Sequence, residues 1–284
     1  MIAIDAPQAN WQLHYEKSGF LETGRYAEAA AYVRRLDEAS PIAKAITMGT
    51  SPEGRSLHAL IISSTRDFTP AESARSKKPL ILVINGIHSG EIEGKDASLI
   101  LARRILIENR YRLLIDKVDL VILPIYNVDG HERFSAYNRV NQNGPKEMGW
   151  RTNSLNLNLN RDFMKADSPE TQGLLKFMRD YQPDFFFDNH TTDGGDWQYH
   201  AAYSIPVGPT QDPSVAAWSR RLANYVTEQC KADGHPIVPY FGGFNPANPS
   251  AGITIDDFTP RYSTGYGAAI NRPTMLVETH VLKP

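Results

Sequence analysis

Short apolar runs alternate with segments of helical periodicity along most of this chain. Runs that are nearly continuous in apolar residues are typical of strands buried on both faces of a sheet. We find five of them, and together they predict one buried sheet. Their sequences and positions are LHALIISS (57–64), PLILVINGI (79–87), KVDLVILPIYN (117–127), PDFFFDN (183–189) and RPTMLVET (272–279).

Helical spacing and length occur before and between these runs, at residues 23–40, 91–110, 168–181 and 212–233. Thr23 is the expected N-cap of the first helix. Strand and helix alternate from residue 57 to residue 278, which predicts an α/β fold with helices on both faces of a central sheet. We expect one domain over residues 1–284, with an N-terminal helical segment, 1–45, packing on it.

Composition and charge restrict the classes of function. The chain has 284 residues, of which 41% are hydrophobic and 22% charged, as in ordinary globular proteins. A net charge of −2 argues against nucleic acid or an acidic membrane as the main partner. Cys230 is the one cysteine, which excludes an internal disulfide and a cysteine-based zinc site. No apolar run approaches the roughly 18–20 residues of a membrane span.

The first residues, MIAIDAPQANWQLHYEKSG, contain neither a basic n-region nor an apolar h-region. The plain expectation is therefore a cytoplasmic enzyme. A secreted or periplasmic protein numbered after removal of its leader would show the same sequence. The oligomeric state stays open.

Chemically active side chains follow three of the predicted strands. His88 and Glu91 follow residues 79–87, His190 follows 183–189, and Glu278 stands near the end of the last run. In open α/β sheets ligands bind beyond the carboxyl ends of the strands. Two histidines and one carboxylate are a common ligand set for a catalytic zinc ion that keeps a position for water. Glu278 would then be free to act as a general base.

Each of these residues has a simpler interpretation when taken alone. A lone His-x-x-Glu is a weak signal, His190 could be a hydrogen-bonded loop histidine, and Glu278 could be a surface carboxylate. Their joint placement at strand ends is what favours a metal site. GHERF (130–134) is not a helical zinc motif, because Ser135 follows His131 by four residues. Nothing in the sequence brings His200 near the other ligands.

The segment WRTNSLNLNLNRDF (150–163) lies in one of two long loops, 127–167 and 191–212. Loops of this length in a compact domain are usually functional or disordered. Taken alone, the segment could be an edge strand with a solvated face. Beside a zinc site its arginines, Arg151 and Arg161, acquire a function, because a guanidinium can grip a carboxylate bidentately or stabilise an oxyanion.

Six motifs in order give the chain a resemblance to the zinc carboxypeptidases, the carboxypeptidase A/B-like metallopeptidases, over about residues 49–278. The chain is also similar to a branch near the cytosolic carboxypeptidases. The motifs are GTSPEGRSLHAL, HSGE, YNVDG, the Arg-to-Asn-Arg spacing of residues 151–161, SPET with FDNH, and MLVET. The resemblance implies a mixed, mostly parallel sheet and one Zn²⁺ ion.

The resemblance also implies a role for each matching residue. His88, Glu91 and His190 would hold the zinc, and Glu278 would be the catalytic base. Arg151 would stabilise the oxyanion. The free carboxylate of a peptide or small amide substrate would be bound by Asn160 and Arg161, and Tyr262, favoured over Tyr266, would cover it.

Three departures from the family pattern stand out. Asn158 occupies a position where many members have an aspartate that orients the first zinc histidine. Val128 replaces the usual proline of the Asn-Pro-Asp-Gly element. The chain stops six residues after Glu278, whereas the family usually continues into a closing helix, so we expect a fragment of a longer protein.

Two other functions compete with a carboxypeptidase. DNHTT (188–192) also resembles the Asp-x-His motif of aspartoacylase and succinylglutamate desuccinylase relatives, which deacylate N-acyl amino acids. A zinc-binding domain without catalysis is the second competitor, although Glu278 argues against it. Side-chain preference stays open as well. Asp256 and Asp257 would favour a basic residue if they lined the pocket, and solvated loop acids are the simpler interpretation.

Overall fold

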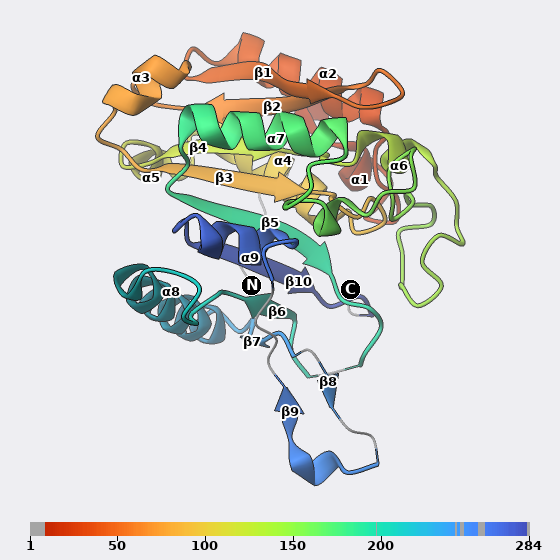
Figure 1. Ribbon diagram of the computed structural model, residues 1–284. Helices are drawn as coiled ribbons and strands as arrows, with labels where there is room; N and C mark the ends of the chain where they lie inside the picture. The colour runs from red at the N-terminus through yellow and green to blue at the C-terminus, as the bar shows by residue number, and fades with distance from the viewer. Residues whose placement is uncertain (1–8, 197, 242, 245–246, 255–258, 283–284) are drawn as a thin grey trace.

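An eight-stranded sheet crosses the computed structural model of the chain (Figure 1). The structure describes residues 9–196, 198–241, 243–244, 247–254 and 259–282. The strand order is β1-β2-β4-β3-β5-β10-β6-β7. The strands are β1 (Ala43–Thr50), β2 (Ser56–Ile62), β3 (Leu80–Asn85), β4 (Asp119–Leu123), β5 (Phe185–Thr191), β6 (Ala201–Ser204), β7 (Ile237–Pro239) and β10 (Thr274–Thr279). A separate two-stranded sheet pairs β8 (Gly243–Phe244) with β9 (Ile253–Thr254).

The four central strands, β4, β3, β5 and β10, run parallel to one another. Antiparallel pairings add β2 and β1 on one side and β6 on the other. The predicted mixed, mostly parallel sheet is therefore confirmed. Because the central strands are parallel, the carboxyl ends of β3, β5 and β10 meet at one edge of the sheet.

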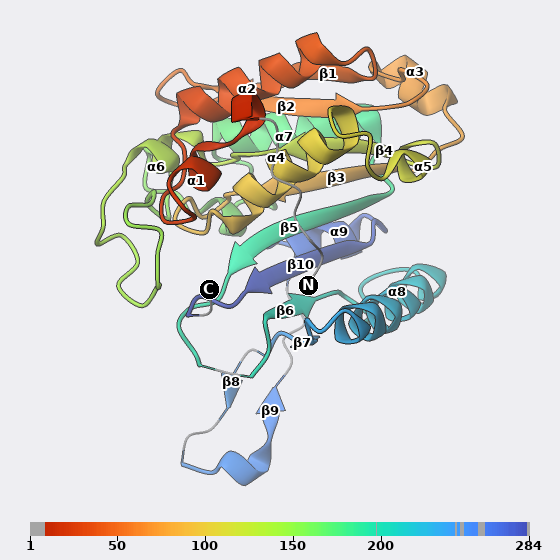
Figure 2. The same cartoon turned by 180° about the vertical axis from the view of Figure 1, so that it is seen from behind.

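Helices cover both faces of this sheet, as predicted. Figure 1 shows α7 (Pro169–Tyr181) and α9 (Ser263–Ala269) on one face, and Figure 2 shows α2 (Tyr26–Ala39), α4 (Glu93–Leu106) and α8 (Pro213–Ala232) on the other. The shorter helices are α1 (His14–Lys17), α3 (Pro70–Arg75), α5 (Arg112–Ile115) and α6 (Val128–Glu132), with 3-10 turns η1 (Ala9–Trp11), η2 (Leu159–Arg161) and η3 (Pro249–Ala251). Of the described helices, none combines the length and apolar character needed to cross a membrane.

The structure corrects some local expectations. Thr23 is not the N-cap of the first helix, because α2 begins at Tyr26 with Arg25 as its N-cap. The Thr23 hydroxyl instead donates to the buried Asp96 carboxylate at 2.7 Å. The long loop 191–212 contains strand β6, and residues 43–45 of the predicted N-terminal helical segment are the first residues of β1.

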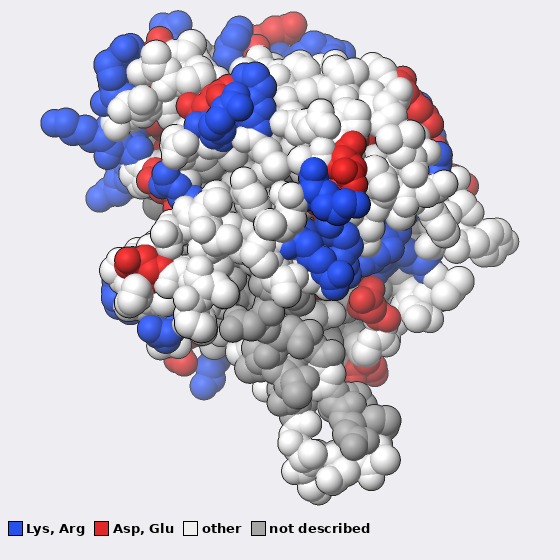
Figure 3. Space-filling view, viewed as in Figure 1, with Lys and Arg blue, Asp and Glu red and all other residues white. Residues whose placement is uncertain are grey.

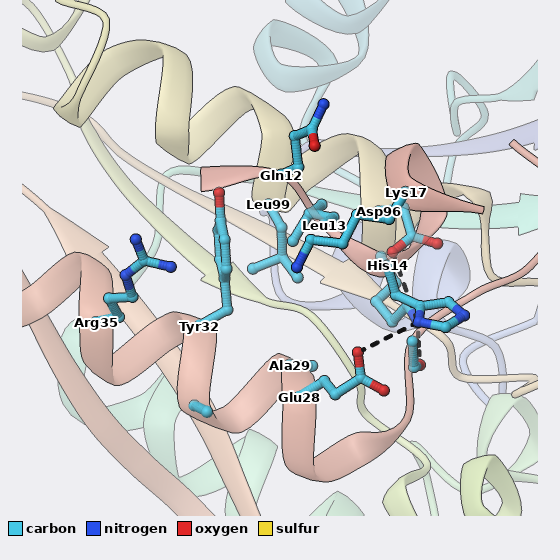
Figure 4. A pocket seen from close by; sticks show the side chains of 13 residues that line it. Gln12, Leu13, His14, Lys17, Glu28, Ala29, Tyr32, Arg35, Asp96 and Leu99 are labelled. Carbon is cyan, nitrogen blue, oxygen red and sulfur yellow. Dashed lines mark hydrogen bonds and ion pairs between the residues drawn. The ribbon is translucent and has the colours of Figure 1, made fainter. Parts of the chain in front are cut away.

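A cavity of about 230 Å³ lies between the N-terminal segment and helices α2 and α4 (Figure 4). His14 bridges two carboxylates beside it, 3.0 Å from Glu22 and 3.6 Å from Glu28. Lys95 is buried there and donates to the Gly24 carbonyl at 2.6 Å. These polar contacts join the segment before α2 to the start of α4.

Arg103 of α4 also binds the N-terminal segment, through several hydrogen bonds. Its side chain is only 2% exposed and donates two hydrogen bonds to the Glu16 carboxylate, at 2.6 and 3.0 Å. It also donates to the Trp11 carbonyl at 3.1 Å and to Glu108 at 2.9 Å. A buried guanidinium is stable only when its donors are satisfied in this way.

Arg103→Ala should therefore lower the free energy of unfolding by about 3–5 kcal/mol, because it removes the charged partner of the Glu16 carboxylate, whose side chain is only 9% exposed. Arg104→Ala, one residue along the same helix and partly exposed, should cost less than about 1 kcal/mol. Denaturant unfolding of the three proteins measures both values. Equal stability of the two variants would show that the Arg103–Glu16 pair does not hold the segment.

Candidate metal centre

Strand register brings the candidate ligands together. His190 of β5 pairs with Glu278 of β10, and Asn85 at the end of β3 pairs with Asn189 of β5. His88 and Glu91 follow β3 in a tight turn, in which the Glu91 N–H donates to the His88 carbonyl at 2.9 Å. Side chains far apart in the sequence thus lie at one sheet edge.

The His88, Glu91 and His190 ligand atoms all lie within 4.8 Å of one another, and all three residues are buried. Glu91 lies between the two rings. Its Oε1 is 3.1 Å from His88 Nδ1 and its Oε2 is 2.9 Å from His190 Nδ1. The expected three residues therefore form a compact cluster that could hold one metal ion.

Hydrogen bonds on the far side of each ring fix its tautomer. Asn158 Oδ1 accepts the Asn160 N–H at 3.0 Å and lies 3.0 Å from His88 Nε2, so His88 Nε2 is the donor. His190 Nε2 lies 3.0 Å from the buried Asp188 carboxylate and donates to it. Each histidine therefore turns Nδ1 toward Glu91, and Nδ1 of the neutral ring carries the lone pair that a metal needs.

Electrostatics at the cluster also fit a divalent cation. Burial by itself would raise the pKa of Glu91, but the charges and hydrogen bonds of His88 and His190 hold it well below its usual value. Burial raises the pKa of the Glu278 carboxyl to about 8; His190 opposes this rise, and neighbouring carboxylates, first among them Glu91, add to it. A cation bound at the cluster would relieve this crowding of carboxylates. The donor set, two imidazoles and a carboxylate, is one that suits zinc.

The YNVDG element places Arg151. Asn127 caps α6 by accepting the Gly130 N–H at 3.0 Å, and its amide donates to the Arg151 carbonyl at 3.2 Å. A Cβ at Gly130 would come within 2.7 Å of the Trp150 carbonyl, so glycine lets the two segments approach. The Arg151 guanidinium then reaches Glu91 Oε1 at 3.2 Å.

Asn160, Arg161 and Tyr262 line the same cavity as the cluster. Asn160 is buried, and its Oδ1 accepts the Ser263 N–H at 3.0 Å. The Arg161 guanidinium stacks on the Tyr262 ring, 4.2 Å from its centroid. Tyr266 instead packs against Phe163, 5.6 Å between ring centroids. The structure thus brings Tyr262, and not Tyr266, to the site.

One cavity of about 90 Å³ joins all eight predicted site residues. Thr191, Asp193, Tyr240, Thr264 and Leu276 line it as well. His200 and His131 are not part of the metal cluster: His200 packs against the His235 ring, and His131 is buried beside Glu132. Asp256 and Asp257 lie outside the described residues.

Sequence reasoning gave no role at the metal cluster to two side chains that contact its ligands, Asp188 and Arg139. Asp188 could have been found, because on a strand it shares a face with His190 two residues later. Arg139 had no local signal. It comes from the loop 127–167, and its guanidinium donates to Glu91 Oε1 at 2.7 Å and to the Thr192 carbonyl at 3.2 Å. Only the folded loop brings it to the metal cluster.

Comparison with known sequences agrees with this geometry. The profile of the family described as zinc carboxypeptidase matches residues 29–235. Carboxypeptidase Z of Homo sapiens is 29% identical over 250 residues, which are 75% of this chain and 36% of that protein. Carboxypeptidase 2 of Trichophyton rubrum is 24% identical over 146 residues, 51% of this chain and 24% of that protein. The chain therefore spans about a third or less of the length of these relatives.

Solved structures show the same fold. A metallo-carboxypeptidase from Burkholderia cenocepacia superposes with a TM-score of 0.66 at 17% identity, covering 90% of this chain and 60% of that one. Carboxypeptidase A from Helicoverpa armigera has a TM-score of 0.64 at 18% identity, covering 92% of this chain and 65% of that one. The predicted fold class is confirmed by these similarities.

Zinc should stabilise the purified chain through this cluster. At a free zinc concentration about 100 times the dissociation constant, binding adds about 2.7 kcal/mol, which corresponds to a rise in Tm of about 4–5 °C. His190→Ala should abolish the rise, and His200→Ala should keep it. Thermal unfolding with zinc and with a chelator measures the difference. An unchanged zinc response in His190→Ala would place the metal elsewhere.

Proposed function

Because the chain belongs to the zinc carboxypeptidase family, we propose that it is a zinc-dependent metallocarboxypeptidase that hydrolyses the C-terminal peptide bond of peptides. The observation that carries this proposal is the cluster at the sheet edge, where Glu278 lines the same cavity as the buried His88, Glu91 and His190. Those three residues would hold the zinc ion. Glu278 remains beside them, outside the ligand set.

Zinc bound there would act as a Lewis acid, which polarises a carbonyl and lowers the pKa of water. Glu278 accepts the proton of the attacking water and later donates it to the leaving amine. Its raised pKa is consistent with this exchange, because a base that must give its proton back works best with a pKa near the operating pH. Its burial also limits access of bulk water to the carboxyl.

Arg151 supports the carbonyl oxygen of the scissile bond. Its side chain is 35% exposed, and one of its nitrogens already contacts Glu91, which holds the guanidinium at the cavity wall. Negative charge develops on the carbonyl oxygen as the tetrahedral intermediate forms. A fixed guanidinium stabilises that charge more than it stabilises the neutral carbonyl, so it lowers the barrier.

Asn160 and Arg161 bind the free carboxylate of the last residue, and Tyr262 covers it. No carboxylate of the described residues forms an ion pair with Arg161, so its guanidinium is available to a substrate anion. A planar guanidinium can hold a carboxylate through two parallel hydrogen bonds. Binding of that carboxylate sets the bond that is cut, the one just before the last residue.

The two competing functions are less well supported. The family profile extends through the Arg-to-Asn-Arg segment and the SPET helix, which the deacylase interpretation does not require. A domain that only binds zinc has no use for a buried carboxyl beside the metal cluster, where burial and neighbouring carboxylates disfavour its charge. Release of amino acids from peptides, compared with hydrolysis of N-acetylaspartate and N-succinylglutamate, distinguishes the three functions.

Glu278→Gln should retain zinc binding but lower kcat by about 1,000-fold or more, because the amide cannot accept the proton of the water. Glu228→Gln, an exposed residue of α8, is the matched control and should keep wild-type turnover. Zinc content and release of the C-terminal residue are measured on the same samples. Near-normal turnover of Glu278→Gln would remove the assignment of the general base.

Arg161→Ala should raise KM by about 10-fold or more with a smaller change in kcat, since it removes charge-assisted hydrogen bonds to the substrate. The wild-type protein should cut peptides with a free C-terminus and spare the same peptides when amidated. If free and amidated peptides are cut equally well, Arg161 does not bind the terminal carboxylate.

A further inference from the structure

Two arginines flank the ring of Tyr262. The Cζ atoms of Arg161 and Arg261 lie 4.2 and 4.8 Å from its centroid, and Arg261 donates a 2.8 Å hydrogen bond to its hydroxyl. Figure 3 shows Lys and Arg side chains gathered on this face of the molecule, over the carboxyl ends of β3 and β5. The second arginine, Arg261, has no part in the proposed function.

Hydrogen bonds hold together the two segments that carry these arginines. The segments that carry them are joined by the hydrogen bond from Phe163 N–H to the Arg261 carbonyl, at 3.3 Å, and by the one from Ser263 N–H to Asn160 Oδ1, at 3.0 Å. Two like charges held this close repel each other. Burial lowers the pKa of the Arg161 guanidinium, and the positive charges of Arg151 and Arg261 lower it further.

The Glu91 and Asp193 carboxylates at the site form ion pairs with arginines, whereas Arg161 and Arg261 do not. Glu91 contacts Arg139 at 2.7 Å and Arg151 at 3.2 Å, and Asp193 contacts Arg139 at 3.4 Å. Within the described ranges of the chain, neither Arg161 nor Arg261 forms an ion pair. The terminal carboxylate of a substrate would neutralise one of the two guanidinium groups, so one positive charge would remain.

Another polar group faces the cavity that Arg161 and Tyr262 line, whereas Arg261 is exposed beside it. Thr264 is fully buried and lines the cavity beside Tyr262 and Leu276. Its hydroxyl has no hydrogen-bond partner in the described part of the protein. A buried hydroxyl without a partner is costly, and a ligand group in the cavity would satisfy it.

We propose that Arg261 and Thr264 determine the specificity of this site by selecting substrates whose last residue is glutamate or aspartate. The inference rests on the proposed carboxypeptidase function. The acidic side chain would supply the second negative charge that the arginine pair lacks, and its oxygen would accept a hydrogen bond from the Thr264 hydroxyl. Arg261 would act at the rim of the cavity, where it contacts the Tyr262 hydroxyl.

The same features disfavour other side chains. A lysine or arginine side chain would enter beside two cations and be repelled. An apolar side chain would leave the buried Thr264 hydroxyl without a partner, whereas a polar side chain would satisfy it. A glutamine side chain would accept a hydrogen bond from the Thr264 hydroxyl but would not neutralise the remaining positive charge of the arginine pair. The predicted order of preference is therefore glutamate, then glutamine, then methionine. These three side chains have similar sizes, so the order reflects charge and hydrogen bonding.

Three peptides identical except for a last residue of Glu, Gln or Met test this order on the zinc-loaded protein. We expect kcat/KM to be about 10-fold or more higher for Glu than for Gln, as charge-assisted hydrogen bonds are stronger than neutral ones. We expect Gln to be cut better than Met. Equal rates for Glu and Gln, or a preference for a peptide ending in Lys, would overturn the proposal.

Two variants test whether Arg261 sets the preference for Glu over Gln and whether Thr264 sets the preference for Gln over Met. Arg261→Gln should reduce the ratio of Glu to Gln without changing the ratio of Gln to Met, and Thr264→Val should do the reverse. Arg220→Gln, an exposed arginine of α8, should change neither. If Arg261→Gln weakens all three peptides equally, Arg261 binds the terminal carboxylate and does not read the side chain.

Binding of free glutamate, glutamine and methionine to the zinc-loaded protein, measured by calorimetry, separates this inference from the proposed function. If no peptide is cut but glutamate binds about 10-fold or more tightly than glutamine, the carboxypeptidase function fails and the acidic preference stands. If peptides are cut and the three amino acids bind equally, the function stands and the acidic preference fails.

Discussion

The buried carboxylate of Glu91 is the group on which the rest of the site depends. A charge removed from water is stable only where several partners replace its hydration. Here two histidines, two arginines and the Thr191 N–H all converge on the two Glu91 oxygens. These partners come from the turn after β3, the loop 127–167 and strand β5. One carboxylate therefore fixes the relative positions of three segments, and the metal cluster is a consequence of that arrangement.

Close backbone approach makes this convergence sterically feasible. A Cβ at Gly90 would lie 2.5 Å from the Arg139 side chain, and one at Gly94 would lie 2.5 Å from Asn189 Cβ. Glycine at these positions lets the loop that carries Arg139 pack against the turn after β3. It also lets α4 begin in direct contact with β5. The two glycines beside Glu91 are thus explained by packing around the carboxylate, and not by a need for unusual backbone angles.

The sequence predicted the framework of this site well, because strong periodic patterns and strand-end chemistry are local signals. The five predicted apolar runs correspond to strands β2, β3, β4, β5 and β10. Elements without such a signal were missed: β6 is a four-residue strand within a polar stretch, and α9 contains two glycines, which lower helix propensity. Thr23 looked like a cap because residue type alone cannot reveal that its hydroxyl has the buried Asp96 as a competing partner. Arg139 depends on how a loop folds, and no local pattern encodes that.

Asn158 is a neutral residue that positions two groups at a site crowded with carboxylates. Its Oδ1 orients the His88 ring and also accepts the Asn160 N–H at the start of η2, so one oxygen positions both a ligand histidine and the next segment. An aspartate there would orient the ring equally well and make it more basic. It would also add another carboxylate to a site where burial and neighbouring acids already raise the pKa of Glu278. Asp188 supplies a charged partner to the other histidine, so the neutral amide keeps the geometry at a lower electrostatic cost.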